Sequence, residues 1–216
     1  KLSASYSTAF VTPSLYQLFA PNIGNTLLDP QEDSTLEFGL ELSDADVFNL
    51  RMTVFQRVQN NFIDYVVSNP TTFEGNYQNI LGETTVQGLE AEFKYIGFKH
   101  ISMNFNYAFV ESKEQQLIRI PKHKFNFSTF FDLTDKTNLS LNFQYNSKRI
   151  SPFQIDSAAI ILEAYSLLNM GVAHHLFNDK LKIFANVSNV FDESYQEAYR
   201  YSTLGRNYKL GVNFSF

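Results

Sequence analysis

Two pairs of side chains in this sequence could coordinate a metal ion. Asp44 and Asp46 are separated by one residue, and His174 and His175 are adjacent. The aspartates fall in a short polar segment, where Asp favours a tight turn by bonding to nearby backbone, and a hard cation needs six or more oxygen ligands. Adjacent residues of a strand point to opposite faces, so the two imidazoles would not converge on one ion. We therefore expect no metal site and no cofactor.

Acid–base catalysis would need a base and an orienting partner at the same end of the fold. His123 with Glu111 or Glu114 is the one combination of this kind on the long connections described below, and no recognisable motif surrounds it. The sequence has no cysteine, which excludes thiolate nucleophiles, disulfides and cysteine zinc sites. We predict that the protein is not an enzyme and that no residue is catalytic.

Binding chemistry is better represented. The long connections are rich in aromatic and amide side chains, namely Tyr16, Phe19, Asn22, Phe73, Tyr77, Asn79, Phe153, Tyr195, Tyr199 and Tyr201. Aromatic rings supply flat contact area and amides supply hydrogen bonds, which suits a bulky ligand fringed with amides. For each residue alone, loop packing or a place in an aromatic girdle is the competing interpretation.

The elements that carry these connections alternate between apolar and polar residues with a period of two, which predicts strands with two different faces. Nine such apolar rows are present. The clearest run through alternate residues from Ile101 to Phe109, Phe125 to Leu133, Leu139 to Tyr145 and Tyr208 to Phe216. A tenth strand, 163–177, has an ambiguous facing, because either of two registers fits its neighbouring Leu and His pairs.

Charge separates the two faces of these strands. The nine apolar rows contain no charged residue, whereas the opposite faces combine Asn, Ser and Gln with a few charges: Glu37, Glu41, Arg51, Glu90, Glu92, Lys94, Asp132 and Lys182. A charge at mid-bilayer on the lipid face of a barrel costs roughly 2–4 kcal/mol, so contact with outer-membrane lipid would enforce a charge-free face.

Composition excludes two other classes of protein. The longest uncharged apolar run, 158–162, is far shorter than the roughly 20 residues that a membrane helix needs. A net charge of -5 without a long basic block is a poor match to nucleic-acid binding. We expect no nucleic-acid partner.

The links between successive strands alternate in length. The long links are 11–33, 59–83, 111–122, 151–162 and 191–204, and the short links are 43–46, 97–99, 134–137 and 177–180; all six prolines lie in the long links. Long loops at one rim and tight turns at the other are typical of an outer-membrane barrel. We predict an all-β fold, a transmembrane antiparallel β-barrel of about ten strands, with its C-terminus on the tight-turn, periplasmic side.

Closure of the sheet leaves two alternatives. The ten strands could form a small barrel by themselves, as in an outer-membrane porin or hydrolase. If they do not close, each open edge would leave several backbone groups unpaired in hydrocarbon, at several kcal/mol apiece. In that case the chain is a piece of a larger barrel. The pattern alone does not choose between the two.

Several strings in the sequence resemble the TonB-dependent outer-membrane receptors. They are 9–19, 25–39, 79–91, Pro121 to Lys124 and 186–195, and the C-terminal string 199–208, Tyr-Arg-Tyr-Ser-Thr-Leu-Gly-Arg-Asn-Tyr, is most similar to the vitamin B12 receptor branch. The resemblance runs essentially from end to end of the chain.

This resemblance implies a 22-stranded barrel, of which residues 1–216 would be the last ten strands. The plug domain, the energy-coupling box and the first strands would lie outside this segment. An N-terminus that reads as mid-strand and an aromatic C-terminal row agree with this expectation. The implied protein resides in the outer membrane of a Gram-negative bacterium and works with the TonB energy-coupling complex through the plug, and a surface lipoprotein is a possible further partner.

The resemblance also implies a ligand and its contacts. The expected ligand is vitamin B12 or a related corrinoid, with a siderophore or haem as the alternative. Arg119 and Tyr201 match family positions that touch the ligand from the extracellular rim. Phe153, Tyr199, Tyr77 and Asn79 complete the predicted ligand-binding set, although the loop around Phe153 matches the family poorly. The calcium-binding aspartates of the family belong to earlier loops and have no counterpart here.

Overall fold

The protein folds as one large antiparallel sheet. The computed structural model describes the backbone of residues 1–69, 71–112, 117–155 and 158–215, and the side chains of these residues except 152–155 and 158. The sheet has ten strands in the order β1-β2-β3-β6-β7-β8-β9-β12-β13-β14. Their bounds are β1 Leu2–Val11, β2 Gln31–Asp44, β3 Phe48–Asn60, β6 Thr84–Phe98, β7 Ile101–Ser112, β8 His123–Thr134, β9 Thr137–Asn146, β12 Tyr165–Leu176, β13 Leu181–Ser188 and β14 Asn207–Phe214. The predicted all-β fold class is confirmed.

Three smaller elements lie in the long connections. These are the helix α1 (Leu15–Phe19), the hairpin β4 (Ile63–Asn69) with β5 (Glu74–Asn79), and the hairpin β10 (Arg149–Ile155) with β11 (Ala158–Leu162). In the part of the chain that the structure describes, no helix is both long and apolar enough to cross a membrane.

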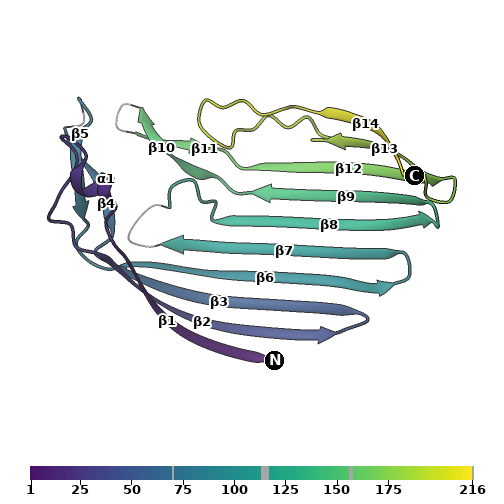
Figure 1. The fold of residues 1–216 in the computed structure, drawn as a ribbon, viewed down its shortest axis with the longest axis horizontal. Coiled ribbons are helices and arrows are strands. Elements are labelled where there is room, and N and C mark those ends of the chain that lie inside the picture. Colours follow the sequence, from purple (N-terminus) through teal and green to yellow (C-terminus); the bar gives the residue numbers. More distant parts are fainter. Residues whose placement is uncertain (70, 113–116, 156–157, 216) are drawn as a thin grey trace.

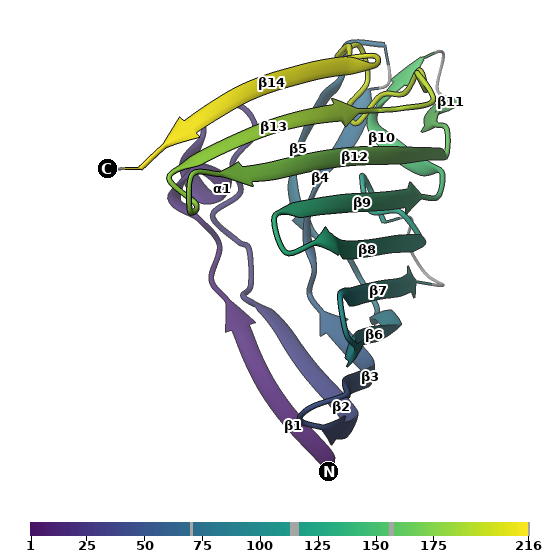
Figure 2. The ribbon, with the colours of Figure 1, turned by 90° about the vertical axis from the view of Figure 1, so that its right-hand side faces the viewer.

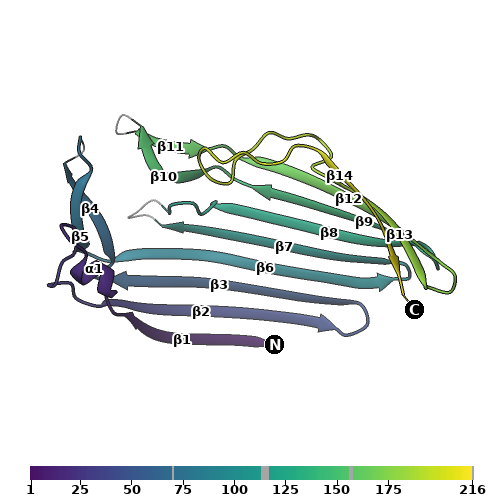
Figure 3. The same cartoon turned by 45° about the horizontal axis from the view of Figure 1, so that its top comes forward.

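The two ends of the sheet differ as the link lengths predict. Figure 1 shows the long connections, with α1 and both hairpins, gathered at one end of the strands and the short turns at the other. β14 finishes at the short-turn end, where the Ser215 amide donates to the Lys180 carbonyl at 2.8 Å. Seen along the strands, the sheet curls into a trough (Figure 2), and Figure 3 shows the same curvature from an oblique angle. The curl follows from the right-handed twist of neighbouring strands.

Strand pairing brings the apolar rows into register. In the middle of the sheet Phe105 faces Phe127, and Phe127 faces Phe143. The Phe105 and Phe125 rings meet edge to face with centroids 4.8 Å apart. Aromatic pairs across strands add to the stability of a sheet, so one face is a continuous apolar surface, much of it exposed.

Pairing also fixes the facing of β12, which the sequence leaves open. Val172 lies between Leu139 of β9 and Ala185 of β13. Leu168 and His174 therefore share the apolar face, and Leu167 and His175 lie on the polar one. The register is set by the neighbours on both sides, because a shift by one residue would turn every β12 side chain over.

The ten strands do not close on themselves. Among the described residues, β1 pairs only with β2 and β14 pairs only with β13. The self-closed ten-stranded barrel, offered above as one alternative for a porin or hydrolase, is therefore wrong. Two unpaired strand edges in hydrocarbon would each be costly.

The polar face is lined with amides over β8 to β12. Asn142 donates to Ser128 at 2.9 Å, Asn169 donates to Asn142 at 3.3 Å, and the Asn189 backbone donates to Asn169 at 2.9 Å. Charges gather over β2, β3 and β6 instead, where Glu41 accepts from Arg51 at 3.3 Å. This combination of amides and a few paired charges suits a wet interior rather than lipid.

Gly88 of β6 lies in close contact with β3 and β7, and this contact can be tested by substitution. It lies opposite Phe55, and a Cβ added to Gly88 would meet the Phe109 carbonyl oxygen and the Phe55 ring, each at 2.5 Å. Replacing Gly88 with alanine is expected to lower the free energy of unfolding by about 1–3 kcal/mol, because the clash involves backbone. Gly39 is the matched control, since its added Cβ would meet only the movable Ser3 hydroxyl closely. The check is the temperature at which the full-length protein loses its folded mobility on an unboiled gel; equal shifts for both variants would contradict the packing.

Candidate ligand-binding rim

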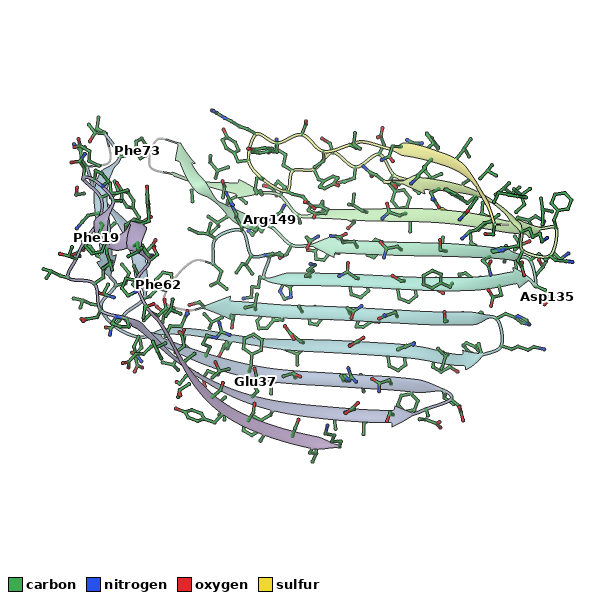
Figure 4. The ribbon with its side chains drawn as sticks, viewed as in Figure 1. Phe19, Glu37, Phe62, Phe73, Asp135 and Arg149 are labelled. Atoms are coloured by element: carbon green, nitrogen blue, oxygen red, sulfur yellow. The ribbon has the colours of Figure 1, made fainter. Side chains whose placement is uncertain are left out.

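The long connections form a rim at one end of the trough (Figure 4). We call this set of described segments, 12–30, 61–69, 71–83, 117–122, 147–155, 158–164 and 189–206, the long-loop rim. All six predicted ligand-binding residues lie in it.

Tyr77 anchors the first part of the rim. Its ring lies 6.2 Å from that of Tyr16 and 5.6 Å from that of Tyr65, both edge to face. Its amide donates to the Ile23 carbonyl at 3.0 Å, and its carbonyl accepts from the Asn25 side chain at 3.0 Å. Tyr77 thereby joins the segment that carries α1 to the β4–β5 hairpin.

Helix α1 begins with a local signal. Ser14 accepts from the Gln17 amide at 3.2 Å, and the Gln17 side chain accepts from the Ser14 amide at 2.8 Å. This reciprocal capping box satisfies two helix donors that would otherwise lack partners. Phe19 at its end and Phe73 at the hairpin turn are exposed and project from this end of the molecule (Figure 4).

Asn79 holds two loops together through its side chain. The amide oxygen accepts from the Asp29 backbone at 2.9 Å, and the amide nitrogen donates to the Asp29 and Asn61 carbonyls at 3.0 and 2.8 Å. Both amide protons and one lone pair are used in this way. Asn79 could therefore contact a ligand directly only through the remaining lone pair of its amide oxygen. It could also affect ligand binding indirectly, by holding the two loops in position.

Replacing Asn79 with alanine is expected to loosen the unit formed by 12–30 and the β4–β5 hairpin. Three hydrogen bonds at about 0.5–1.5 kcal/mol each are lost, so protease cleavage in 12–30 on intact cells should become severalfold faster. Gln78→Ala is the control, because the exposed Gln78 amide donates only to neighbouring Asn76 at 2.9 Å. Equal cleavage of both variants would show that Asn79 does not connect the loops.

Arg119 is exposed and has a positive φ of 62°. Its amide donates to the Ile150 carbonyl at 2.8 Å, and Ile118 forms a parallel bridge with Ile150. The segment before β8 is thus held against β10 while the guanidinium remains accessible. Phe153 belongs to β10 by its backbone, but its side chain lies outside the described part of the chain.

The last predicted residues belong to the β13–β14 connection. Tyr201 is 71% exposed, and its amide donates to the Ala198 carbonyl at 3.1 Å. Tyr199 is half-buried, with the Arg200 guanidinium 5.2 Å from its ring centre. Two aromatic rings therefore sit on one loop, and one of them is open to a ligand.

Asn189 and Asp192 fix the base of this loop. The Asn189 side chain accepts from the Glu193 amide at 2.8 Å and donates to the Glu193 carbonyl at 2.9 Å. Asp192 accepts from the Arg206 backbone at 2.7 Å. Residues 186–195, which carry part of the family resemblance, thus act as a structural base for the loop.

The side chains considered for metal binding or catalysis have local roles. Asp44 accepts from the Asp46 backbone at 3.3 Å, as expected in a tight turn. His174 bonds to Thr137 at 2.9 Å, and His175 lies 3.3 Å from Asp179 beyond the strand end. Within the described residues, no group of three or more His, Cys, Asp or Glu side chains could hold a metal ion.

His123 and Glu111 each contact another side chain. The His123 Nδ1 atom lies 2.8 Å from the Tyr107 hydroxyl, and Glu111 is ion-paired with Lys122 at 2.6 Å. Glu114, the other candidate partner, lies outside the described residues.

One cluster in the rim was missed from the sequence. Arg149 and Tyr165 are both buried, and the Arg149 guanidinium carbon lies 5.4 Å from the centre of the Tyr165 ring. An arginine at the start of a rim segment carries no signal of burial by itself. Only the fold shows that the β13–β14 connection covers it.

Comparisons with known proteins agree with this geometry. Residues 1–190 match the family model described as TonB dependent receptor-like, beta-barrel. The vitamin B12 transporter BtuB of Vibrio cholerae serotype O1 is 31% identical over the whole chain, which spans 34% of that protein.

Solved structures share the fold at lower identity. The copper transporter OprC superposes with a TM-score of 0.80 at 18% identity, over all of this chain and 36% of that one. The siderophore receptor PirA from Acinetobacter baumannii superposes with a TM-score of 0.77 at 20% identity, over all of this chain and 39% of that one. The chain thus spans about a third of the length of the proteins it matches.

Proposed function

Since this chain belongs to the TonB-dependent receptor family, we propose that the protein of which it is part imports vitamin B12 or a related corrinoid across the outer membrane of a Gram-negative bacterium. The observation that supports this choice of ligand is the 31% identity to the vitamin B12 transporter BtuB, which extends over the entire chain. The family consists of receptors and transporters, so the proposed action is capture and passage of a ligand without covalent chemistry.

The rim supports this ligand through its chemistry. A corrinoid has a broad ring fringed with amides and a nucleotide tail with a phosphate. The exposed Arg119 guanidinium would donate to phosphate or amide oxygens, and Tyr201 would pack its ring against the corrin edge. Phe153, Tyr199 and Tyr77 would add apolar contact, and Asn79 would act mainly by holding its loops in place.

The rest of the sheet has a supporting role in this proposal. Its apolar face would contact outer-membrane lipid, and the free edges of β1 and β14 would pair with the remaining strands of the barrel. The polar trough would enclose a plug domain encoded outside this chain, through which the TonB complex would supply energy. A surface lipoprotein, if present, would cover the rim.

Uptake by living cells tests the proposal. Cells that depend on the full-length receptor should accumulate labelled cyanocobalamin, and Arg119→Ala should weaken ligand binding at least about tenfold, the loss typical of a hydrogen bond to a charged group. Lys148→Ala is the matched control, because Lys148 is another exposed cation of the rim. If cells with the wild-type receptor took up no cyanocobalamin, the proposed ligand would be wrong. If Arg119→Ala and Lys148→Ala bound and took up the ligand equally, the proposed role of Arg119 would be wrong.

A ferric siderophore or haem is the alternative ligand within the same family. Both are bulky and carry flat or aromatic surfaces that an aromatic rim could contact. A competition experiment separates the two proposals. Excess unlabelled siderophore or haem should leave cyanocobalamin uptake unchanged if the corrinoid is the ligand.

A further inference from the structure

A polar cluster built on two buried residues, Arg149 and Tyr165, connects the β13–β14 connection to the rest of the rim. We call Arg149, Tyr165, Tyr195, Gln196 and Glu197 the Arg149 cluster. One guanidinium nitrogen of Arg149 donates to the Gln196 carbonyl at 2.7 Å, and the Tyr165 hydroxyl donates to Glu197 at 3.1 Å. The Tyr165 and Tyr195 rings lie with centroids 4.4 Å apart.

The cluster joins segments far apart in the sequence. Arg149 begins β10 and Tyr165 begins β12, whereas the other three residues belong to the loop between β13 and β14. Figure 4 places Arg149 at the base of the rim, where these segments meet. Tyr165 and Asn169 are four residues apart on β12, so both side chains lie on its polar face. The loop that contacts Tyr165 therefore folds over the polar side of β12 at this end of the sheet.

The contacts fix one conformation of the loop. Arg149 donates to the backbone carbonyl of Gln196. The residue before it, Tyr195, makes the ring contact with Tyr165, and the residue after it, Glu197, accepts from the Tyr165 hydroxyl. These three contacts, on consecutive residues, specify the path of the chain two residues before Tyr199. Burial, with the nearby Glu197 charge as the next cause, raises the pKa of Tyr195.

The cluster is poorly suited to global stability. Arg149 is 7% exposed, yet its other terminal guanidinium nitrogen has no hydrogen-bond partner among the described residues; the side-chain nitrogen of Asn146, which pairs with Tyr165, has none there either. A buried donor without an acceptor costs about 1–3 kcal/mol, and an apolar residue of similar volume often serves a fold as well or better than a buried charge. The specific contribution of Arg149 is to the position of the loop.

We propose that Arg149 and Tyr165 are positioning residues that hold 195–201 against the rim and thereby present Tyr199 and Tyr201 to the ligand. This inference rests on the proposed function for its consequence on binding, but not for the docking of the loop. A binding-competent conformation that is populated only in part weakens the observed affinity by that fraction. Loss of the cluster should therefore weaken binding without any loss of a direct ligand contact.

Two variants remove the contacts selectively. Tyr165→Phe deletes the hydroxyl that bonds to Glu197 and keeps the ring beside Tyr195. Arg149→Met keeps the side-chain volume and removes both the donor to Gln196 and the unpartnered nitrogen. Arg149→Lys restores a donor and a charge and should recover part of the effect. Tyr107→Phe is the matched control, since it also removes one tyrosine hydrogen bond, that to His123 at 2.8 Å on the opposite face.

Loop position is measured without ligand. A spin label on Ser202→Cys, at an exposed loop position of this cysteine-free segment, reports motion of the loop in the full-length receptor once any cysteine outside the segment is replaced with serine. The label should be restricted in the wild-type and Tyr107→Phe proteins and clearly more mobile in Tyr165→Phe and Arg149→Met. The unfolding temperature of Arg149→Met should stay at or above that of the wild type, which a purely structural role would not produce.

Binding supplies the second readout, on the same variants without the label. Cyanocobalamin affinity should fall about five- to tenfold in Tyr165→Phe and Arg149→Met, the factor for one ordinary hydrogen bond, and stay unchanged in Tyr107→Phe. Equal label mobility in all proteins, or a mobile loop with unchanged affinity, would overturn the proposal. If the wild-type receptor does not bind cyanocobalamin, the proposed function fails, and label mobility alone decides whether the cluster positions the loop.

Discussion

Replacing Phe127 with lysine is expected to destabilise the barrel in the membrane by about 2–4 kcal/mol, because it places a charge near the middle of the lipid-facing surface. Phe127 lies mid-strand between Phe105 and Phe143 on the charge-free face. The full-length receptor should then show a greatly reduced folded fraction in outer membranes, measured by its mobility on unboiled gels.

The adjacent residue supplies the control for this substitution. Asn126 points to the opposite face and lines a groove of about 370 Å³ together with Glu90 and Glu92. A lysine at Asn126 should be tolerated, since this groove already holds the cations Arg51 and Lys124 beside Glu90 and Glu92 and would be open to water. Tolerance of Phe127→Lys with loss of folded Asn126→Lys would mean that the faces are assigned the wrong way round.

Replacing Asn189 with alanine is expected to have the second largest effect, a loss of about 2–4 kcal/mol from the base of the β13–β14 connection. Asn189 is 4% exposed, makes side-chain bonds to Glu193 in both directions, and has a positive φ of 52°. Alanine would remove these partners of the Glu193 backbone groups and would be strained in the left-handed region.

Two variants separate these causes. Asn189→Gly keeps the left-handed conformation and loses the bonds, so it should recover only the strain. Asn178→Ala, at an exposed turn position with φ 55°, measures the cost of the backbone strain by itself. The measurement is the rate of protease cleavage within 189–206 and the unfolding temperature of the full-length receptor. If Asn189→Ala behaves like Asn178→Ala, the side-chain bonds do not hold the loop.

The sheet was predictable because lipid imposes a simple rule on it. A period of two with no charge on one face reveals strand positions and facing, and link length reveals the two rims. β12 was the exception, since Leu167 beside Leu168 and His174 beside His175 fit both registers. Its facing depends on Leu139 and Ala185 of the neighbouring strands, which a single strand's pattern does not contain.

The rim was less predictable, because its contacts connect distant segments. The sequence predicts only long links where the β4–β5 and β10–β11 hairpins lie, since short paired strands without a lipid face show no apolar row. Asn79 was selected as an amide that could meet a ligand, yet its amide connects Asp29 with Asn61. Arg149 gave no signal at all, because its burial depends on a loop almost fifty residues later.

The central claim is that this sheet belongs to a receptor whose rim binds a corrinoid, and equilibrium titration of the purified full-length receptor with cyanocobalamin tests it most directly. We expect saturable binding below micromolar ligand, weakened at least about tenfold by Arg119→Ala and unaffected by excess ferric siderophore. Absence of binding at micromolar cyanocobalamin, with saturable binding of a ferric siderophore in its place, would contradict the account.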